Sequence, residues 1–326
     1  MKITFAKPDE ETSKKINSLF PISDCFIKVT PGNVMVPRKY ENIAESIRNL
    51  TVYEDDTWLV SYPRTGSTWA QEMIWLLANK LDFKGAKEML QTRCPLIELT
   101  ALFDEDHNEW INSAVGNTVE LVQNTPRPRL VRSHLPWDLL PKDLEKVCPK
   151  IIYTARNPKD LCVSFYYYCK LVHGLKGTFE EFSDLFLKGS TPIGPYFSHV
   201  LPFWQRHNQS NVLFLKYEDM NHDINSIIKK CADFLEVDYK MSDEDLQKIC
   251  EHLRFDRMQT NPAVNLEYMN IEGLDKDNKE NNSNSKFIRK GKIGDWKNIF
   301  SSELSKKFDA WTEEELKGSD LTFEYE

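Results

Sequence analysis

The segment that most constrains the fold runs from Trp58 to Leu77, where an apolar run, a short polar turn and an amphipathic stretch follow one another. This order predicts a buried strand, a tight turn and a helix. The turn, Arg64-Thr65-Gly66-Ser67-Thr68, places a positive charge, hydroxyls and a residue without Cβ at the start of the predicted helix. Unpaired N–H groups and the helix dipole at that position favour a phosphate-like anion. The first ligand class to consider is therefore a phosphorylated nucleotide or a close relative.

Two features of this turn keep a second interpretation open. Ser and Thr are ordinary N-cap residues, so the segment can also be a capped turn that binds no ligand. The turn also departs from the strict Gly-x-x-x-x-Gly-Lys-Ser/Thr pattern, which argues against an ordinary kinase or ATPase. Taken alone, the turn leaves a phosphate site and a plain capped turn equally open.

The length of 326 residues, with 40% hydrophobic residues, is sufficient for one large α/β domain with a substantial core. No repeat and no Gly/Ser-rich linker divides the sequence, so residues 1–326 are predicted to form a single domain. Residues 1–40 are polar and contain several prolines, and we expect an N-terminal extension that packs on the surface. The polar run 275–285 is expected to be a mobile loop.

The formal net charge of −8 argues against a general nucleic-acid-binding protein and against a protein that binds membrane surfaces. Any anion site must therefore be local. The sequence contains no run of 18 apolar residues, and its N-terminus turns acidic before a signal-peptide core, which predicts a cytoplasmic protein. Seven cysteines without Cys-x-x-Cys spacing indicate reduced thiols, and no cluster of ligand residues predicts a metal site.

Four short apolar runs read as buried parallel strands, at 57–61, 129–132, 150–154 and 211–215. Helices are predicted between and after them, at 68–80, 159–170, 178–188, 195–208, 223–235 and 242–252. The predicted fold class is α/β: a single domain with a central, mostly parallel sheet flanked by helices and a P-loop-like anion-binding turn.

Polar side chains follow each of the four predicted strands. The strands are followed in turn by Arg64-Thr65-Gly66-Ser67-Thr68, Ser133-His134-Leu135-Pro136, Arg156-Asn157-Pro158-Lys159-Asp160 and Tyr217-Glu218-Asp219. Because ligands bind beyond the carboxyl ends of the strands in open α/β sheets, we expect these residues to form one site. Two arginines, hydroxyls, a histidine and a tyrosine suit a multiply anionic ligand with a proton-transfer step beside it.

Each element of this site also has a plainer interpretation. His134 can be an ordinary loop histidine, Arg156 can pair with Asp160, and Ser164 can face solvent one turn into its helix. A second basic cluster, from Arg289 to Trp296, contains glycines that let N–H groups approach an anion, although it can equally be a solvated loop. The coincidence of all these elements at one predicted edge favours the ligand site.

At this point the sequence resembles the cytosolic sulfotransferases that use 3′-phosphoadenosine 5′-phosphosulfate (PAPS), from about Tyr40 to Asp309. Tyr62-Pro63-Arg64-Thr65-Gly66-Ser67-Thr68-Trp69 is similar to the 5′-phosphosulfate loop of that family. The run from Arg156 through Ser164 is similar to its 3′-phosphate strand and helix, and Arg289-Lys290-Gly291 with Gly294-Asp295-Trp296-Lys297 to its C-terminal signature.

The resemblance implies a role for each matched residue. His134 would be the catalytic base, acting with Arg64, Arg132 and Ser164. The 5′-phosphosulfate would be held by Arg64, Thr65, Gly66, Ser67 and Thr68, and the 3′-phosphate by Arg156, Ser164, Arg289, Lys290 and Gly291. Trp69 and Phe255 would stack on the adenine, with Tyr217 hydrogen-bonding near the base. PAPS would be the cofactor and adenosine 3′,5′-bisphosphate its product, without a metal.

The sequence departs from the family pattern at several positions. Arg64 and Arg132 stand where lysines are usual; because an arginine cannot donate a proton, their roles should be electrostatic. Leu253 stands where a Thr is common near the adenine. The family's dimer motif Lys-x-x-x-Thr-Val-x-x-x-Glu is altered at Ser302 and Lys306, which predicts a monomer or a non-standard dimer.

The acceptor is the least constrained part of the prediction. Aromatic residues suggest a small hydrophobic substrate with a hydroxyl group, such as a phenol, steroid, retinoid or other alcohol; they are Phe103, Trp110, Trp137, Tyr166, Tyr167, Tyr168 and Tyr268. The resemblance also leaves open a dehydratase, in which sulfation creates a leaving group. A binding protein that has lost turnover, against which His134 argues, and a nucleotide kinase remain as further alternatives.

Overall fold

The computed structural model describes residues 2–102, 116–265 and 286–326. Its centre is a sheet of four parallel strands, β4 (Thr57–Ser61), β5 (Leu130–Ser133), β6 (Lys150–Ala155) and β7 (Val212–Lys216), in the order β5-β4-β6-β7. These are the four predicted strands, shifted by at most one residue at either end. All five residues of β4 are buried, as expected for a strand covered on both faces.

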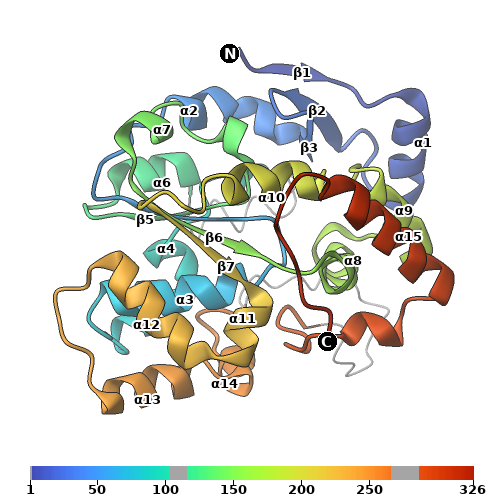
Figure 1. The fold of residues 1–326 in the computed structure, drawn as a ribbon. Helices are drawn as coiled ribbons and strands as arrows, with labels where there is room; N and C mark the ends of the chain where they lie inside the picture. Colours follow the sequence, from blue (N-terminus) through green and yellow to red (C-terminus); the bar gives the residue numbers. More distant parts are fainter. Residues whose placement is uncertain (1, 103–115, 266–285) are drawn as a thin grey trace.

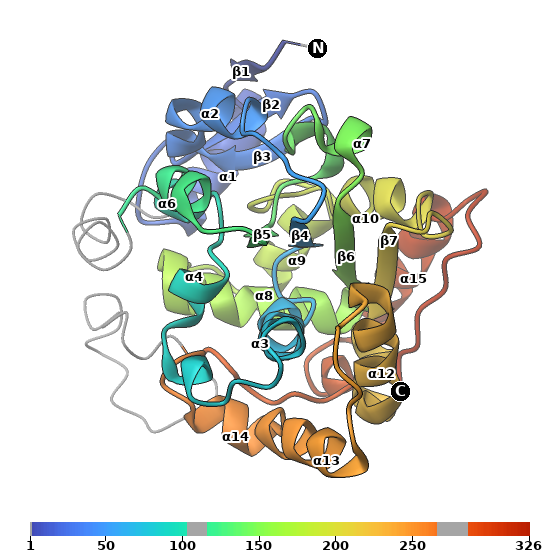
Figure 2. The ribbon, with the colours of Figure 1, turned by 90° about the vertical axis from the view of Figure 1, so that its left-hand side faces the viewer.

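The two faces of the sheet belong to two hydrophobic cores, because side chains alternate along each strand. Leu59 and Ile152 pack with α3 (Ser67–Ala78), α12 (Ile224–Leu235) and α13 (Asp243–His252). Val60 and Tyr153 pack on the other side with α8 (Pro158–His173), α9 (Phe179–Leu187) and α10 (Tyr196–Trp204). Figure 1 shows α10 above the strands and α3, α12 and α13 below them, and Figure 2 shows α3 and α13 below them as well. The predicted α/β fold class is confirmed.

The six predicted helices are all present, and their local sequences explain where they begin. Asn157 caps α8 by accepting the N–H of Asp160, and Pro158 occupies the first turn. Thr178 and Glu181 form a capping box at the start of α9. Gly174, with φ of +63°, ends α8 in the left-handed conformation. The capping residues therefore fix both ends of the helix that follows β6.

The N-terminal segment is more deeply integrated than its polar composition indicates. It forms an antiparallel sheet of β1 (Thr4–Ala6), β2 (Phe26–Thr30) and β3 (Val34–Pro37), with α1 (Glu10–Leu19) between β1 and β2. Ile16, Val29 and Val36 are buried in the same core as α8 and α9. The sequence analysis predicted no strands here, and this sheet brings Pro37 to the central cavity.

The remaining helices connect and close this arrangement. They are α2 (Ala44–Arg48), α4 (Leu90–Arg93), α6 (Thr118–Asn124), α7 (Leu144–Val147), α11 (Tyr217–His222), α14 (Phe255–Thr260) and α15 (Ser302–Glu315). Short 3₁₀ turns lie at 38–42, 85–87, 99–101, 137–139 and 295–298. The polar run 275–285 lies outside the described residues. In the described ranges, no helix is both long and apolar enough to cross a membrane, and no cluster of three potential metal ligands occurs.

Candidate functional site

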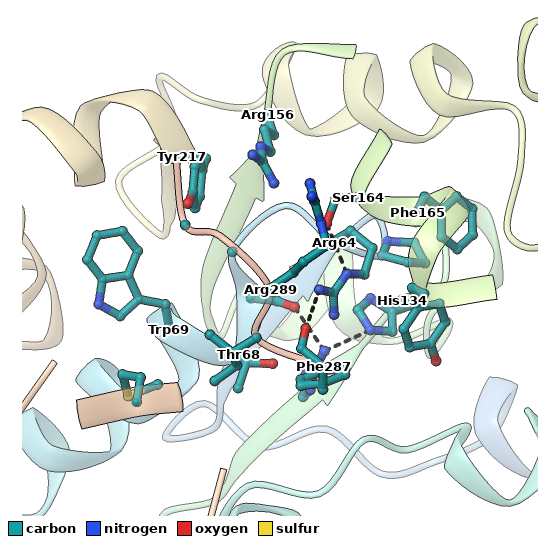
Figure 3. Close-up of a pocket in the computed structure, with 18 of the residues that line it drawn as sticks. Arg64, Thr68, Trp69, His134, Arg156, Ser164, Phe165, Tyr217, Phe287 and Arg289 are labelled. Atoms are coloured by element: carbon teal, nitrogen blue, oxygen red, sulfur yellow. Dashed lines mark hydrogen bonds between the residues drawn. The ribbon is translucent and has the colours of Figure 1, made fainter. Parts of the chain in front are cut away.

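A cavity of about 320 Å³ lies at the carboxyl ends of the four parallel strands. Its lining includes Arg64 after β4, His134 after β5, Arg156 after β6 and Tyr217 after β7. Figure 3 shows these four side chains around one space, together with Arg289 from the C-terminal basic cluster. The four polar strand ends, separated by up to 153 residues in sequence, are therefore brought to one cavity, as the sheet rule anticipates.

The turn between β4 and α3 has a backbone that requires glycine at one position. Gly66 has φ of +87°, and a Cβ there would lie 2.7 Å from Cδ2 of the Tyr217 ring. The Thr65 hydroxyl contacts the Tyr62 carbonyl at 2.9 Å and the Thr154 hydroxyl at 3.0 Å, so it braces the turn from inside. Thr65 is not among the residues that line the cavity, and a ligand contact there would have to come from its backbone.

The cavity is strongly cationic although the whole chain carries a net charge of −8. Its described lining contains no Asp or Glu, and it contains the cationic side chains of Arg64, Arg132, Arg156, Arg254, Arg289, Lys290 and Lys292. Burial, together with the neighbouring Arg156 and Arg289, lowers the pKa of Arg64 to about 10. A cluster of like charges in a buried space is unfavourable on its own, which indicates an anionic ligand.

Several of these cations have internal partners that a ligand could replace or supplement. Arg64 Nη2 donates to the Phe287 carbonyl at 2.7 Å, and Arg156 Nη2 donates to the Lys292 carbonyl at 3.1 Å. Arg289 and Lys290 both pair with Asp295, at 2.5 and 2.7 Å. Arg156 Nε and Arg289 Nη1 are buried without a hydrogen-bond partner in the described part of the chain. Buried donors of this kind call for an acceptor, and a phosphate oxygen would supply one.

His134 lies on the cavity wall with both ring nitrogens engaged. Nδ1 lies 2.8 Å from the Ser61 carbonyl, which can only accept, so Nδ1 carries the proton. Nε2 then accepts from Arg132 Nη2 at 2.8 Å. Burial, and after it the Arg132 charge, hold the pKa of His134 well below its usual value of 6.5. The ring is therefore neutral, and its lone pair on Nε2 accepts from Arg132 in the cationic part of the cavity.

Another part of the cavity is lined by aromatic side chains. Trp69 and Phe255 both line it, and Trp69 meets Tyr217 edge to face with ring centroids 6.0 Å apart. The Arg156 guanidinium lies 4.1 Å from the Tyr217 ring centroid. Gly291 has φ of +66°, and a Cβ there would lie 2.3 Å from Cδ2 of Phe255. The basic cluster therefore passes directly against the aromatic wall, and only a glycine allows this approach.

The part of the cavity beside His134 is apolar. It is lined by Leu96, Leu99, Leu102, Phe165, Tyr168, Ile193 and Phe287. Of these, the sequence analysis proposed Tyr168 alone. The leucines follow no motif: their segment reaches the cavity because its backbone pairs with Arg132 of β5, through Ile97 N–H to the Arg132 carbonyl at 2.9 Å. No signal in the sequence pointed to them.

The other proposed acceptor residues are not brought to this wall. Trp137 does not line the cavity; its ring packs against Phe203, at 5.4 Å between centroids, and under the Arg206 guanidinium. The reason is that the turn carrying Trp137 packs on α10. Tyr166 donates to the Gly177 carbonyl, and Tyr167 lies under Arg289. Phe103, Trp110 and Tyr268 lie outside the described residues.

The remaining site residues lie around the cationic centre. Ser67, Thr68 and Ser164 line the cavity; Ser164 Oγ accepts from Arg64 Nε at 3.3 Å, and Ser67 Oγ accepts from Arg132 at 2.8 Å. A parallel sheet with an anion-binding turn at its carboxyl edge, a cationic cavity and a neutral histidine is typical of an enzyme that transfers a group from an anionic donor.

Comparison with known proteins identifies the particular class. Residues 54–320 match the sulfotransferase domain family. The chain is 34% identical to luciferin sulfotransferase from Photinus pyralis over 94% of its length and 84% of that protein's. It is 36% identical to sulfotransferase 1E1 from Bos taurus, covering 92% of this chain and 96% of that one. The chain belongs to the sulfotransferase family and is a sulfotransferase, an enzyme class for which PAPS is the standard donor.

Solved structures agree with this assignment. Retinol dehydratase in a complex with retinol and PAP (adenosine 3′,5′-bisphosphate) superposes with a TM-score of 0.88 at 30% identity, covering 99% of each chain. Mouse sulfotransferase SULT7A1 complexed with PAP has a TM-score of 0.69 at 29% identity, covering 91% of this chain and 96% of that one. The fold of this chain is therefore shared with proteins whose structures contain PAP.

Proposed function

We propose that this enzyme moves the sulfuryl group of PAPS to the hydroxyl of a small lipophilic acceptor, with His134 as general base. One observation carries the proposal: a neutral imidazole lines a cavity whose described lining combines several cations, no carboxylate and a set of apolar side chains. The cationic region suits a nucleotide with phosphate groups at its 3′ and 5′ positions. The apolar wall suits the hydrophobic part of the acceptor. Solved relatives that contain PAP support the same nucleotide class.

In this proposal the turn after β4 holds the 5′-phosphosulfate, through Arg64, Ser67, Thr68 and the N–H groups of Thr65 and Gly66. The 3′-phosphate contacts Arg156, Ser164, Arg289, Lys290 and Gly291. Trp69 and Phe255 stack on the adenine, beside Tyr217. The buried donors Arg156 Nε and Arg289 Nη1, which lack hydrogen-bond partners in the described residues, support this placement.

The chemistry requires positioning and charge stabilisation from these side chains. PAPS supplies the sulfuryl group when it is bound. In this step the acceptor hydroxyl replaces Arg132 Nη2 as the donor to His134 Nε2, which takes the hydroxyl proton as that oxygen attacks sulfur. Arg64 and Arg132 remain protonated and stabilise negative charge on the leaving phosphate side, by about 2–4 kcal/mol each if they act as preorganised donors do. Arginine cannot give up its proton here, so both contributions are electrostatic.

A small hydroxylated lipophile is the acceptor class that the apolar wall favours. The relatives are named for substrates or ligands of this type: luciferin for the Photinus pyralis enzyme, and retinol and androsterone for the retinol dehydratase structures. Leu96, Leu99 and Ile193 offer only apolar side chains to such a molecule, whereas the Arg64 guanidinium lies 4.6 Å from the Phe287 ring centroid. We therefore propose a phenol, steroid, retinoid or comparable alcohol as the acceptor.

A dehydratase is the second candidate, because the retinol dehydratase structures match with TM-scores near 0.9 over almost the entire chain. In that reaction the sulfate ester would be eliminated in the same cavity. Mass spectrometry of the products separates the two functions. A stable sulfate ester supports the transferase, whereas a desaturated product with free sulfate supports the dehydratase.

The first test is binding of adenosine 3′,5′-bisphosphate, compared with ATP, ADP and AMP in the absence of added metal. A ligand at 100 times its Kd stabilises the folded state by about 2.7 kcal/mol, so we expect a rise in Tm of several degrees for the bisphosphate alone. Turnover of PAPS with a panel of hydroxylated lipophiles then tests transfer. A preference for ATP, or no shift with any nucleotide, would contradict the proposal.

A further inference from the structure

We propose that Glu98 and His199 are positioning residues that clamp the backbone of His134 from two sides and so fix its imidazole for proton transfer. Neither side chain lines the cavity or was anticipated from the sequence. The proposal rests on the proposed function, in which His134 is the base. It extends that function by assigning a purpose to two fully buried polar side chains.

Glu98 holds the amino side of His134. Its side chain is buried, and Oε1 accepts the His134 N–H at 2.6 Å while Oε2 accepts the Ser133 hydroxyl at 3.0 Å. The segment that carries Glu98 is itself fixed to β5, because Arg132 N–H donates to the Pro95 carbonyl at 2.9 Å. The carboxylate is therefore anchored to the same strand that ends at the base.

His199, on α10, holds the carbonyl side of His134. Its Nε2 lies 2.9 Å from the His134 carbonyl, and because a carbonyl only accepts, Nε2 must be the protonated nitrogen. Nδ1 then accepts from the Tyr153 hydroxyl at 2.8 Å. Burial lowers the pKa of His199 to about 4, which keeps this tautomer neutral. The donor to His134 is thus fixed by a hydroxyl on β6.

The clamp acts on a ring that is also held at both nitrogens. Ser61 at the end of β4 accepts from Nδ1, and Arg132 donates to Nε2. Backbone and ring together receive contacts from four separate parts of the fold. Such over-determination matters for a base, because a displacement of about 1 Å from the reactive geometry can cost ~10²-fold in rate.

The chemistry of Glu98 distinguishes this from an ordinary structural contact. A buried carboxylate is costly unless a cation pairs with it, and Glu98 forms no salt bridge within the described residues. Burial accordingly raises its pKa to about 7. Glu72, which is equally buried, has Arg93 and His252 at 2.7 Å. A neutral side chain could accept one N–H at a lower free-energy cost of burial than a carboxylate. The carboxylate of Glu98 therefore indicates a functional requirement for two acceptor atoms on one rigid group.

The test compares two clamp variants with a matched control. Glu98→Gln keeps the shape but replaces one acceptor oxygen by a donor, so it cannot accept from both His134 and Ser133. We expect kcat to fall by ~10-fold or more, as for a loss of preorganised geometry, while the Kd for adenosine 3′,5′-bisphosphate stays within about twofold. Glu72→Gln removes a buried carboxylate whose partners are Arg93 and His252 rather than His134, and it should lower Tm without changing kcat.

His199 supplies an independent pair of variants, which decides the outcome if Glu98→Gln does not fold. His199→Leu removes the donor to the His134 carbonyl and should lower kcat by a similar factor. His199→Gln places an amide N–H near the position of Nε2 and should recover most of the lost rate. A role limited to packing would instead predict that Leu is tolerated better than Gln in this buried position.

A measurement without turnover separates failure of the clamp from failure of the proposed function. The ¹⁵N signals of the His134 ring in the nucleotide-free protein should report one tautomer, protonated at Nδ1, and should become mixed or broadened in Glu98→Gln. Wild-type protein that transfers no sulfuryl group but shows these spectra refutes only the function. Active wild type, with kcat and spectra unchanged in Glu98→Gln and His199→Leu, refutes the clamp.

Discussion

The proton affinity of the His134 imidazole is set by its surroundings. The Ser61 carbonyl accepts the Nδ1 proton, and the positively charged Arg132 donates to Nε2. Burial and the Arg132 charge disfavour the imidazolium form and lower the pKa of His134, and they outweigh the Ser61 contact, which raises it. The ring therefore stays unprotonated at neutral pH, which a general base requires before it can accept a proton.

This residue supports a direct prediction. His134→Ala should lower kcat by ~10²–10⁴-fold, as expected for loss of a general base. The rise in Tm with adenosine 3′,5′-bisphosphate should remain, since the phosphate contacts lie elsewhere. Single-turnover kinetics with PAPS measures the first effect and thermal unfolding the second. Wild-type turnover in the variant would exclude His134 as the base.

At the scale of the element, the β4–α3 turn is the part whose shape is least replaceable. Gly66 has a left-handed backbone and lies against Tyr217. A methyl group at Gly66 must therefore displace the Tyr217 ring, over which the Arg156 guanidinium lies. We expect Gly66→Ala to weaken binding of adenosine 3′,5′-bisphosphate by ~10-fold or more and to destabilise the fold by about 1–3 kcal/mol.

The control for this prediction is Gly318→Ala. Gly318 has a similar φ of +78°, but no atom lies within 4 Å of the position that a Cβ would occupy. It should therefore show the backbone strain without the loss of nucleotide affinity. Calorimetric titration of both variants separates the two effects. Equal affinities in Gly66→Ala and the wild type would mean that the turn does not contact the nucleotide.

Elements also differ in how far their sequences predict them. The strands β4 to β7 and the helices after them were predictable, because each is a continuous apolar run or an amphipathic stretch with its own cap. The strands of the N-terminal sheet are three to five residues long, which is too short for an alternation of apolar and polar residues to be recognised. They depend on pairing with one another. The wall around Leu96 and Leu99 depends on a backbone contact to Arg132, which no local pattern encodes.

The same contrast applies to the site. Arg64, His134 and Arg156 were predictable because they follow strands at the edge where ligands bind. Glu98 and His199 were not, because they act on a backbone rather than on the cavity, and they come from segments without a motif. Trp137 was misplaced since an aromatic side chain beside a catalytic motif can pack on a helix as readily as on a ligand.

At the scale of the whole molecule, buried titratable groups make stability depend on pH. His199 has a pKa of about 4 when folded, against 6.5 for the ordinary side chain. Between these values the unfolded chain binds a proton that the folded chain does not bind, so the free energy of unfolding falls as the pH falls. His134 acts in the same direction. Glu98, with a raised pKa of about 7, opposes them.

We therefore predict that His199→Gln flattens the acid side of the stability profile. The difference in unfolding free energy between wild type and variant should be constant above pH 7 and should change by about 1.4 kcal/mol for each pH unit below 6.5, in favour of the variant. Urea denaturation between pH 5 and 8 measures this difference. A constant difference over the whole range would show that His199 titrates alike in the folded and unfolded chains.

The internal partners of the cavity cations also bear on how a reaction cycle ends. Arg64 and Arg156 hold backbone carbonyls, and Arg289 and Lys290 share Asp295. In the proposed function, the cations that a departing nucleotide leaves can form these internal contacts again, and we expect this exchange to favour its release. Competition from these internal partners weakens the binding of PAPS and of its bisphosphate product alike. Binding energy that is the same for donor and product does not accelerate the chemical step. If the cations bind the nucleotide as proposed, we expect this arrangement to speed release of the product without loss of transition-state stabilisation.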